Sequence, residues 1–150
     1  MRYSYEAELR YSEEEHAWYA EFPGFDGSAY ADGDTVEEAV RNAAGVLELT
    51  ICDYLDGGRA LPAPSFHEPP LTVISVEVDD GAIAASRCMS VLDAAELLGV
   101  TPGRVSQLLG KGQLEAYEYR GTRLVTIASV NARRTSAPRT GRPRKAVAVG

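Results

Sequence analysis

An alternation of apolar and polar residues dominates the start of the chain. Every second residue from Tyr3 to Tyr11 is apolar, and the residues between them are charged or polar. Because successive side chains of a strand point to opposite faces, this period of two predicts a strand with one buried face. The alternation resumes from Trp18 to Phe22 after the polar turn at residues 12–15, so the two runs predict a β-hairpin.

The spacing of the apolar residues changes to that of a helix at Thr35. Thr35 and Glu38 have the spacing of a capping box, in which the hydroxyl accepts from the backbone of residue 38 and the carboxylate reaches back. Apolar residues then recur at helical spacing as far as Tyr54. With a short third strand expected within residues 25–30 and a last strand at residues 71–78, the order is βββαβ. This order predicts a small α+β domain with one helix packed on a sheet.

The charge of the chain is divided between its two parts. Residues 1–86 hold 18 Asp and Glu against four Arg, a net charge of −14, whereas residues 87–150 hold four acids against eleven Lys and Arg, a net charge of +7. These values sum to the −7 of the whole chain. Because a basic surface attracts phosphates and an acidic one repels them, the two parts are expected to bind different partners.

The basic part contains two short amphipathic helices separated by a tight turn. Ser90 and Thr101 are the expected N-caps, Gly99 lies in the turn, and Pro102 occupies the first position of the second helix. Such a helix-turn-helix binds DNA when its second helix enters the major groove, and the hairpin predicted behind it would act as a wing. The alternative is a helical hairpin used for packing or dimerisation. The candidate DNA contacts on the second helix and the wing are Thr101, Arg104, Ser106, Gln107, Lys111, Arg120 and Arg123.

The helix-turn-helix region also matches the pattern of a known group. The sequence from Val91 to Pro102, VLDAAELLGVTP, together with residues 105–109 and 112–116, resembles the winged helix-turn-helix of the excisionase and MerR-like group. The resemblance implies a DNA-binding domain of a kind that commonly dimerises and bends DNA.

Residues 135–150 lack a hydrophobic period and are expected to form a disordered basic tail. Within this tail the run TGRPRK, which begins at Thr140, resembles an AT-hook, whose Arg-Gly-Arg-Pro core lies in the minor groove of A·T-rich DNA. The match is incomplete, because Thr140 stands where that core has its first arginine. A solvated tail that only attracts phosphates is the alternative. The candidate contacts are Arg142, Arg144 and Lys145.

A second resemblance covers most of residues 1–78. The segments FPGF at residues 22–25 and ADGDT at residues 31–35, with matches within residues 38–43 and in the loop 58–64, resemble the HicB-type antitoxins of bacterial toxin–antitoxin pairs. The resemblance implies a degenerate ribonuclease H-like fold that binds a small basic ribonuclease, a HicA-like toxin, and covers its active site. The acidic charge agrees, because opposite charge accelerates encounter and selects the partner.

The aromatic residues of this region have two interpretations. They are either apolar anchors of an interface with the toxin, or core residues beneath a surface that the acids simply solvate. The candidate anchors are Trp18, Phe22, Pro23 and Phe25.

A nuclease is a further possibility for a ribonuclease H-like fold, because two-metal catalysis needs several converging carboxylates. The acids to nominate are Glu6 or Glu8, Glu48 and Glu77, yet no spacing makes them converge, and they are expected to be ordinary exposed residues. The two histidines lack a paired nucleophile or metal ligand nearby. The sequence therefore predicts a protein that is not an enzyme.

Cysteine content and hydropathy indicate the compartment. Cys52 and Cys88 stand without a CxxC spacing, so neither a disulfide framework nor a zinc site is expected, and no cofactor is predicted. The first residues lack the apolar run of a signal peptide, and no stretch approaches the ~20 apolar residues of a membrane span. The expected compartment is the cytoplasm.

These patterns together predict a HicB-like toxin-binding domain at residues 1–80, a linker at 81–88, a helix-turn-helix domain at 89–134 and the tail at 135–150. The predicted protein is an antitoxin that neutralises a small basic ribonuclease and represses its own operon by binding double-stranded operator DNA. Two-fold symmetry doubles the few base contacts of one small domain, so a homodimer or higher homo-oligomer is expected. The alternative is a plain transcriptional regulator, or an excisionase-like architectural protein, whose N-terminal domain senses a ligand.

Overall fold

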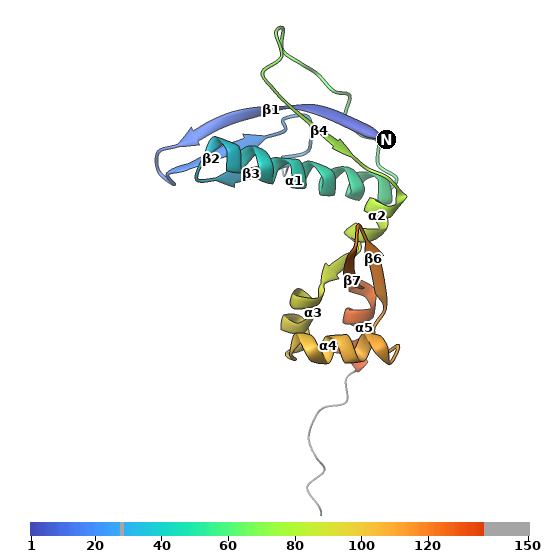
Figure 1. Cartoon of the computed structure of the whole chain (residues 1–150). Helices are drawn as coiled ribbons and strands as arrows, with labels where there is room; N and C mark the ends of the chain where they lie inside the picture. The colour runs from blue at the N-terminus through green and yellow to red at the C-terminus, as the bar shows by residue number, and fades with distance from the viewer. Residues whose placement is uncertain (28, 137–150) are drawn as a thin grey trace, which may run out of the picture. The chain divides into compact units, whose positions relative to one another are not determined.

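The computed structural model describes residues 1–27 and 29–136, and the contacts divide the chain into two compact units, Met1–Ser86 and Arg87–Gly150 (Figure 1). Each unit has its own sheet and its own buried residues. We call them the N-terminal unit and the C-terminal unit and describe each by itself.

The N-terminal unit is a four-stranded antiparallel sheet with one long helix on one face (Figure 1). Its strands are β1 (Arg2–Ser12), β2 (Ala17–Glu21), β3 (Tyr30–Gly33) and β4 (Thr72–Glu77), in the order β3-β2-β1-β4. Helix α1 (Val36–Asp56) falls between β3 and β4 in the sequence and packs against the sheet. The predicted βββαβ order and the α+β class are confirmed.

The third strand begins later than the sequence suggests. It is predicted within residues 25–30, but β3 begins at Tyr30 because the residues before it form a tight turn. The amide of Phe25 donates to the carbonyl of Phe22 (3.1 Å), and Gly27 adopts a φ of 63°, which suits glycine. The turn buries Phe25 instead of placing it on a strand.

The alternation of β1 places one row of side chains toward α1. Tyr5 and Ala7 belong to this row and are buried, and Tyr5 lies opposite the buried Ile74 of β4. The other row lies on the face of the sheet that α1 leaves uncovered, which we call the open face. The half-buried character that the sequence predicts for β1 is confirmed at Tyr5 and Ala7, whereas Tyr11 of the same row is exposed and Glu6 of the other row is buried.

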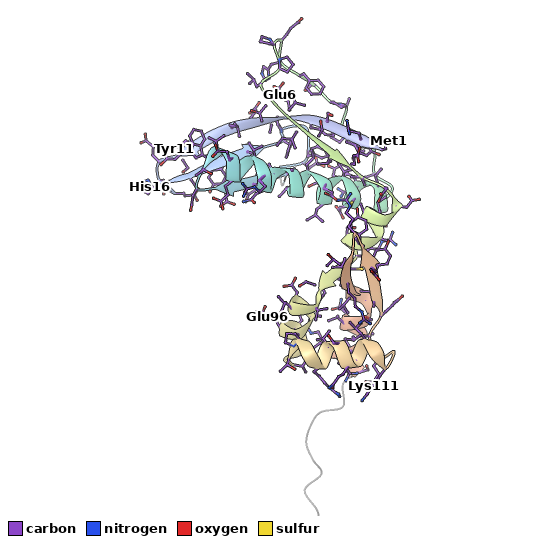
Figure 2. All side chains as sticks on the ribbon, in the orientation of Figure 1. Met1, Glu6, Tyr11, His16, Glu96 and Lys111 are labelled. Atoms are coloured by element: carbon purple, nitrogen blue, oxygen red, sulfur yellow. The ribbon has the colours of Figure 1, made fainter. Side chains whose placement is uncertain are left out.

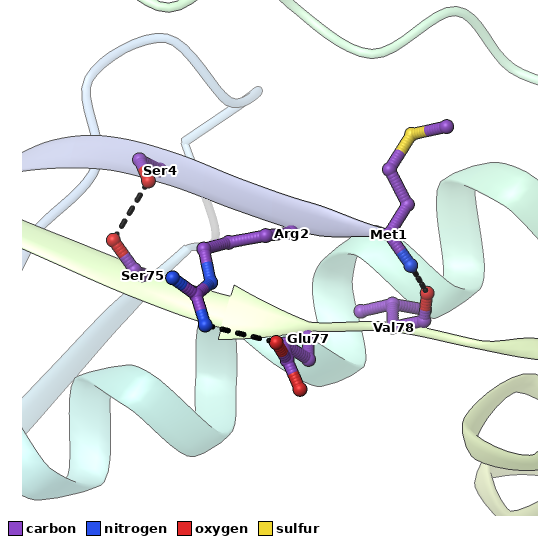
Figure 3. Close-up of polar contacts among 6 residues, drawn as sticks. All are labelled: Met1, Arg2, Ser4, Ser75, Glu77 and Val78. Atoms are coloured by element: carbon purple, nitrogen blue, oxygen red, sulfur yellow. Dashed lines mark hydrogen bonds and ion pairs between the residues drawn. The ribbon is translucent and has the colours of Figure 1, made fainter.

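Polar contacts join β1 to β4 near the start of the chain (Figure 3). The guanidinium of Arg2 pairs with the carboxylate of Glu77 (3.0 Å), and the hydroxyls of Ser4 and Ser75 form a hydrogen bond (2.7 Å). The amino group of Met1 donates to a backbone carbonyl just beyond β4 (2.8 Å). These contacts fix the register of two strands that lie about 70 residues apart in the sequence.

Helix α1 begins at the predicted capping box. The hydroxyl of Thr35 accepts from the amide of Glu38 (3.1 Å), and the Glu38 carboxylate accepts from the amide of Asp34 (3.0 Å). The chain enters the helix from β3 at Gly33, where a Cβ atom would lie 2.5 Å from the amide nitrogen of Ala39. Only glycine permits this close approach of strand and helix.

Residues 57–71 connect α1 to β4 and cross to the open face of the sheet (Figure 1). Two hydrogen bonds tie this loop to β1. The hydroxyl of Tyr5 donates to the carbonyl of Pro62 (2.8 Å), and the amide of His67 donates to the carboxylate of Glu6 (3.0 Å). The loop therefore covers part of a surface that the alternation of β1 predicts to be exposed.

The segment predicted as a linker, residues 81–88, is regular structure for most of its length. Helix α2 (Asp80–Ser86) precedes strand β5 (Cys88–Ser90). The carboxylate of Asp79 accepts from the amide of Ala82 (2.7 Å) and satisfies the start of the helix, which is rich in alanine. Small residues carry little hydrophobic period, so this helix is hard to recognise in the sequence.

In residues 87–136, the described part of the C-terminal unit, three helices combine with a three-stranded antiparallel sheet in the order β5-β7-β6. Its remaining elements are α3 (Val91–Leu98), α4 (Pro102–Gly110), β6 (Ala116–Tyr119), β7 (Thr122–Thr126) and α5 (Ile127–Ser136). The two predicted helices and the hairpin behind them are present, and α5 extends to Ser136, two residues into the segment predicted as the tail.

Helices α3 and α4 begin at the N-caps that the sequence predicts. The hydroxyl of Ser90 accepts from the amide of Asp93 (3.0 Å), and that of Thr101 from the amide of Arg104 (3.2 Å). Gly99 ends α3 in the left-handed conformation, with a φ of 65°. The core between the helices and the sheet is apolar, and its fully buried members are Ala94, Val105, Leu108, Val125 and Val130.

Candidate functional site

Four of the polar residues predicted to contact DNA lie on α4 or at its C-cap. The apolar residues of α4 turn toward the core, and Arg104, Ser106, Gln107 and Lys111 are exposed, with Lys111 at the end of the helix (Figure 2). The guanidinium of Arg104 donates to the side-chain oxygen of Gln107 (3.1 Å). Ser106 points to another side of α4, because consecutive residues of a helix are rotated by about 100°. Arg104 and Gln107 therefore act together, whereas Ser106 stands apart from them.

The hydroxyl of Thr101 is occupied by its capping hydrogen bond to the amide of Arg104. Its structural role is thus clear, and it fixes the position at which α4 begins.

Two basic residues lie at the hairpin of the C-terminal unit. Strands β6 and β7 are joined by Arg120 and Gly121, which both have positive φ values (48° and 76°), as in the two-residue turns that suit twisted hairpins. The guanidinium of Arg120 lies 4.9 Å from the ring centroid of Tyr119, and Arg123 is exposed near the start of β7. The hairpin therefore presents Arg120 at its tip, and Arg123 lies on β7 opposite Glu118. The tail candidates Arg142, Arg144 and Lys145 lie outside the described residues.

The four candidate anchors of the N-terminal unit occupy different environments. Phe22 and Phe25 have exposed fractions of only 1% and 3%, so they belong to the core and do not present their rings to a partner. Trp18 is half-buried against Tyr11, with ring centroids 5.2 Å apart, and Pro23 is exposed. The core interpretation therefore applies to the two phenylalanines.

Glu6 is a buried charged residue that the sequence pattern does not reveal. Its position in the alternation of β1 predicts an exposed side chain, but the 57–71 loop covers it and leaves 7% of the residue accessible (Figure 2). The carboxylate accepts from the amides of His67 (3.0 Å) and Leu71 (3.3 Å) and contacts Nδ1 of the His67 ring. The hydrogen bond with the His67 side chain is the main reason that the pKa of Glu6 is lowered, and the same bond raises the pKa of His67.

The Glu6–His67 pair predicts a pH dependence of stability. The lowered pKa of Glu6 stabilises the fold above its ordinary value of 4.5, and this contribution is lost as pH falls through the folded-state pKa. The raised pKa of His67 stabilises the fold below its ordinary value of 6.5, and this contribution is lost as pH rises through the folded-state pKa. The stability difference between the wild type and a His67→Ala variant should therefore be largest between pH 4.5 and 6.5. Urea denaturation from pH 4 to 8 measures this difference, and a difference that does not vary with pH would contradict the pairing.

The carboxylates considered for a nuclease site do not assemble. Glu6 is held by the loop on the open face, Glu48 lies on α1 against the other face, and Glu77 pairs with Arg2. Within residues 1–27 and 29–136, no group of three or more His, Cys, Asp and Glu residues lies close enough to hold a metal ion. The described residues therefore offer no two-metal site.

The two cysteines and the lengths of the helices bear on whether the protein has a disulfide or a membrane-spanning segment. Cys52 is buried and Cys88 half-buried, and the two cysteines form no disulfide. None of the described helices is long and apolar enough to cross a membrane.

A pocket of about 200 Å³ lies beside Glu6, between β1 and the 57–71 loop. Part of its wall comes from β1, part from the turn after β2, and the rest from the loop. Its lining residues are Tyr5, Glu6, Glu8, Phe22, Pro23, Gly24, Ala63, Ser65, Phe66 and His67.

Comparison with known protein families shows that the chain matches the family described as HicB_like antitoxin of bacterial toxin-antitoxin system. It covers residues 4–80, slightly more than half of the 150-residue chain and nearly the whole N-terminal unit. No curated protein matches the chain. The chain therefore belongs to the HicB-like family of bacterial antitoxins, which are not enzymes.

Proposed function

We propose that the chain neutralises a small basic ribonuclease toxin of the HicA type with its N-terminal unit and represses its own operon with its C-terminal unit, in the cytoplasm. The observation that carries this proposal is that the antitoxin match, at residues 4–80, lies within the N-terminal unit, which ends at Ser86. The two units also differ in charge: residues 1–86 have a net charge of −14 and residues 87–150 one of +7.

The N-terminal unit has the charge and the free surface that a basic partner needs. Its open face carries no helix, and a net charge of −14 creates a field that attracts cationic proteins and speeds their encounter. An RNA-cleaving toxin must itself attract phosphates, so it is suited to this field. We propose that the toxin docks on the open face and that the unit is a degenerate ribonuclease H-like domain.

The order of helices and strands in the C-terminal unit supports a winged helix-turn-helix. Helices α3 and α4 are joined by a three-residue turn from Gly99 to Thr101, and the β6–β7 hairpin follows α4. Arg104 and Gln107 are exposed on α4, and arginine and glutamine form the bidentate contacts that read guanine and adenine in the major groove. We propose that α4 enters the major groove, that Arg120 and Arg123 contact the adjacent backbone, and that the protein binds its operator as a homodimer or higher homo-oligomer.

The paired substitution Arg104→Ala and Gln107→Ala tests the DNA half of this proposal. Loss of two base contacts, each worth about 1–3 kcal/mol, is expected to weaken operator binding by tenfold or more. Binding of the toxin and inhibition of its RNA cleavage are expected to stay at the wild-type level. Fluorescence anisotropy with operator DNA and a cleavage assay with toxin measure the two activities on the same samples.

The matched control for that variant is Asn131→Ala, which changes an exposed polar residue on α5, a helix that carries none of the candidate DNA contacts. It is expected to change operator affinity less than twofold. Unchanged DNA affinity in the Arg104 and Gln107 variant would contradict the assignment of α4 as the recognition helix, and equal loss of DNA and toxin binding would contradict separate modules.

Truncation after Ser136 tests the proposed role of the basic tail, because it removes Arg139, Arg142, Arg144 and Lys145 and leaves α5 intact. Each lost phosphate contact is expected to reduce the slope of log affinity against log salt by about 0.9. Titrations at several salt concentrations measure the slope, and a full-length chain with these four residues changed to glutamine is the control for the truncation. An unchanged slope in both variants would mean that the tail does not touch DNA.

A further inference from the structure

The pocket between β1 and the 57–71 loop has the size of a single side chain. Its volume is about 200 Å³, whereas pockets for drug-sized ligands and cofactors measure about 300–1,000 Å³. Its wall contains two carboxylates, Glu6 and Glu8, which occupy alternate positions of β1 and therefore face the same side of the sheet. A small pocket with this lining is suited to a cationic group.

Glu8 carries the free charge of this pocket. Its side chain is exposed, and no ion pair to it is found among residues 1–27 and 29–136. The register places Glu8 directly opposite Glu21 of β2, and like charges at facing positions destabilise a sheet. The repulsion between Glu8 and Glu21 lowers the stability of the free protein. A cation from a partner would relieve this repulsion, which favours binding of that partner.

Phe66 supplies an aromatic surface at the same pocket. Its exposed fraction is 46%, although it is a large apolar side chain in a loop. The contacts of the neighbouring His67 with the Glu6 carboxylate hold this part of the loop against β1. The buried pair thus helps to hold Phe66 in the wall of the pocket that Glu8 also lines.

We propose that this pocket receives the guanidinium group of an arginine from the basic toxin. Arginine combines a planar set of donors that fits a carboxylate with a flat face that stacks on aromatic rings, and an ammonium group offers only a point charge. Glu8 accepts the guanidinium donors, Phe66 stacks on its face, and Glu6 with His67 keeps the pocket in shape. This inference rests on the proposed toxin-binding function and names the contact through which the toxin is recognised.

Substitutions at the pocket test this contact in the complex. Isothermal titration calorimetry of the full chain against the purified product of the adjacent small open reading frame gives the wild-type affinity. Glu8→Gln is expected to weaken binding about tenfold or more, because a close charge pair is lost, and Phe66→Ala is expected to weaken it severalfold. Glu14→Gln, the same change at an exposed acid in the β1–β2 turn, is expected to leave affinity within twofold of the wild type.

Stability measurements separate binding from folding in these variants. Glu8→Gln removes the repulsion with Glu21, so it is expected to leave the urea midpoint unchanged or raised. If Glu8→Gln and Glu14→Gln bind the toxin equally well, the pocket proposal is overturned while the antitoxin function stands. If the wild type itself does not bind the product, the proposed function and this contact both fail.

A small probe tests the chemistry of the pocket without the toxin. Titration of the isotopically labelled protein with N-acetyl-arginine amide should shift the backbone NMR signals of Phe66 and His67. N-acetyl-citrulline amide, which has a similar shape and no charge, should leave them in place. Equal shifts with both probes, or shifts that persist in Glu8→Gln, would overturn recognition of a guanidinium group.

Discussion

Replacement of Phe25 by alanine is expected to lower the free energy of unfolding of the N-terminal unit by about 3–5 kcal/mol. Its ring is 3% exposed and packs against three aromatic neighbours, with centroids 4.8 Å from Tyr5, 5.5 Å from Tyr54 and 6.5 Å from Phe22. The substitution would leave a cavity where the turn after β2, strand β1 and helix α1 meet. Urea denaturation followed by circular dichroism measures the loss.

Phe66→Ala is the matched control for Phe25→Ala, because it makes the same chemical change at a side chain that is 46% exposed. Its cost is expected to be below about 1 kcal/mol, since an exposed ring loses little burial. The two variants thus have opposite profiles: Phe25→Ala destabilises the fold, and Phe66→Ala weakens toxin binding without destabilising it. Equal stability of the two variants would contradict the assignment of Phe25 to the core and would favour its other interpretation, an apolar anchor that contacts the toxin.

Replacement of Leu108 by alanine is expected to remove most of the stability of the C-terminal unit, so that the unit unfolds close to ambient temperature. Leu108 is 1% exposed at the centre of the core, and a Leu→Ala change in a core costs about 2–5 kcal/mol. The described part of this unit spans residues 87–136, and a unit of that size has a total stability of only about 2.5–7.5 kcal/mol. The variant should therefore lose operator binding, and its N-terminal unit should still bind the toxin.

Leu92→Ala is the control for Leu108→Ala, because Leu92 lies on α3 with 69% of its surface exposed. It is expected to keep both operator binding and the unfolding transition of the C-terminal unit. Thermal denaturation and an electrophoretic mobility-shift assay on the same proteins measure these properties. If Leu108→Ala also removed toxin binding, the two units could not be independent modules.

Local rules of sequence predict much of this fold. The alternation from Tyr3 to Tyr11, the capping box at Thr35 and the N-caps Ser90 and Thr101 all produce the elements that they indicate. Each of these signals depends on residues within a few positions of one another, so the sequence contains it in full. The antitoxin family is likewise indicated by short segments within residues 22–64 and is shown by the family match.

The features that the sequence does not reveal depend on distant residues or on weak patterns. Glu6 is buried because His67, 61 residues later, folds over it, and no local pattern contains that contact. Phe25 enters the core because a tight turn replaces the expected strand. Helix α2 consists of small residues whose pattern has little period, and its start depends on one carboxylate, that of Asp79.

For the candidate DNA contacts, the sequence predicts which side chains are exposed but not which of them bind one another. The exposure of Arg104 and Gln107 follows from the apolar period of α4, so the sequence predicts it correctly. The hydrogen bond between them is a detail that only the structure reveals. In the N-terminal unit, the pocket beside Glu8 is formed by three segments of the sequence: β1, the turn after β2 and the 57–71 loop. No local sequence pattern contains all three, so the sequence does not predict the pocket.

The most direct test of the antitoxin function is a growth-rescue experiment with the small open reading frame adjacent to this gene. Expression of that neighbour alone should arrest growth, and co-expression of the present chain should restore it while the two proteins purify as one complex. Rescue should persist with Arg104→Ala and Gln107→Ala and weaken with Glu8→Gln. A harmless neighbour, or failure of rescue when both proteins are present and soluble, would contradict neutralisation of a neighbouring toxin and leave only the DNA-binding proposal.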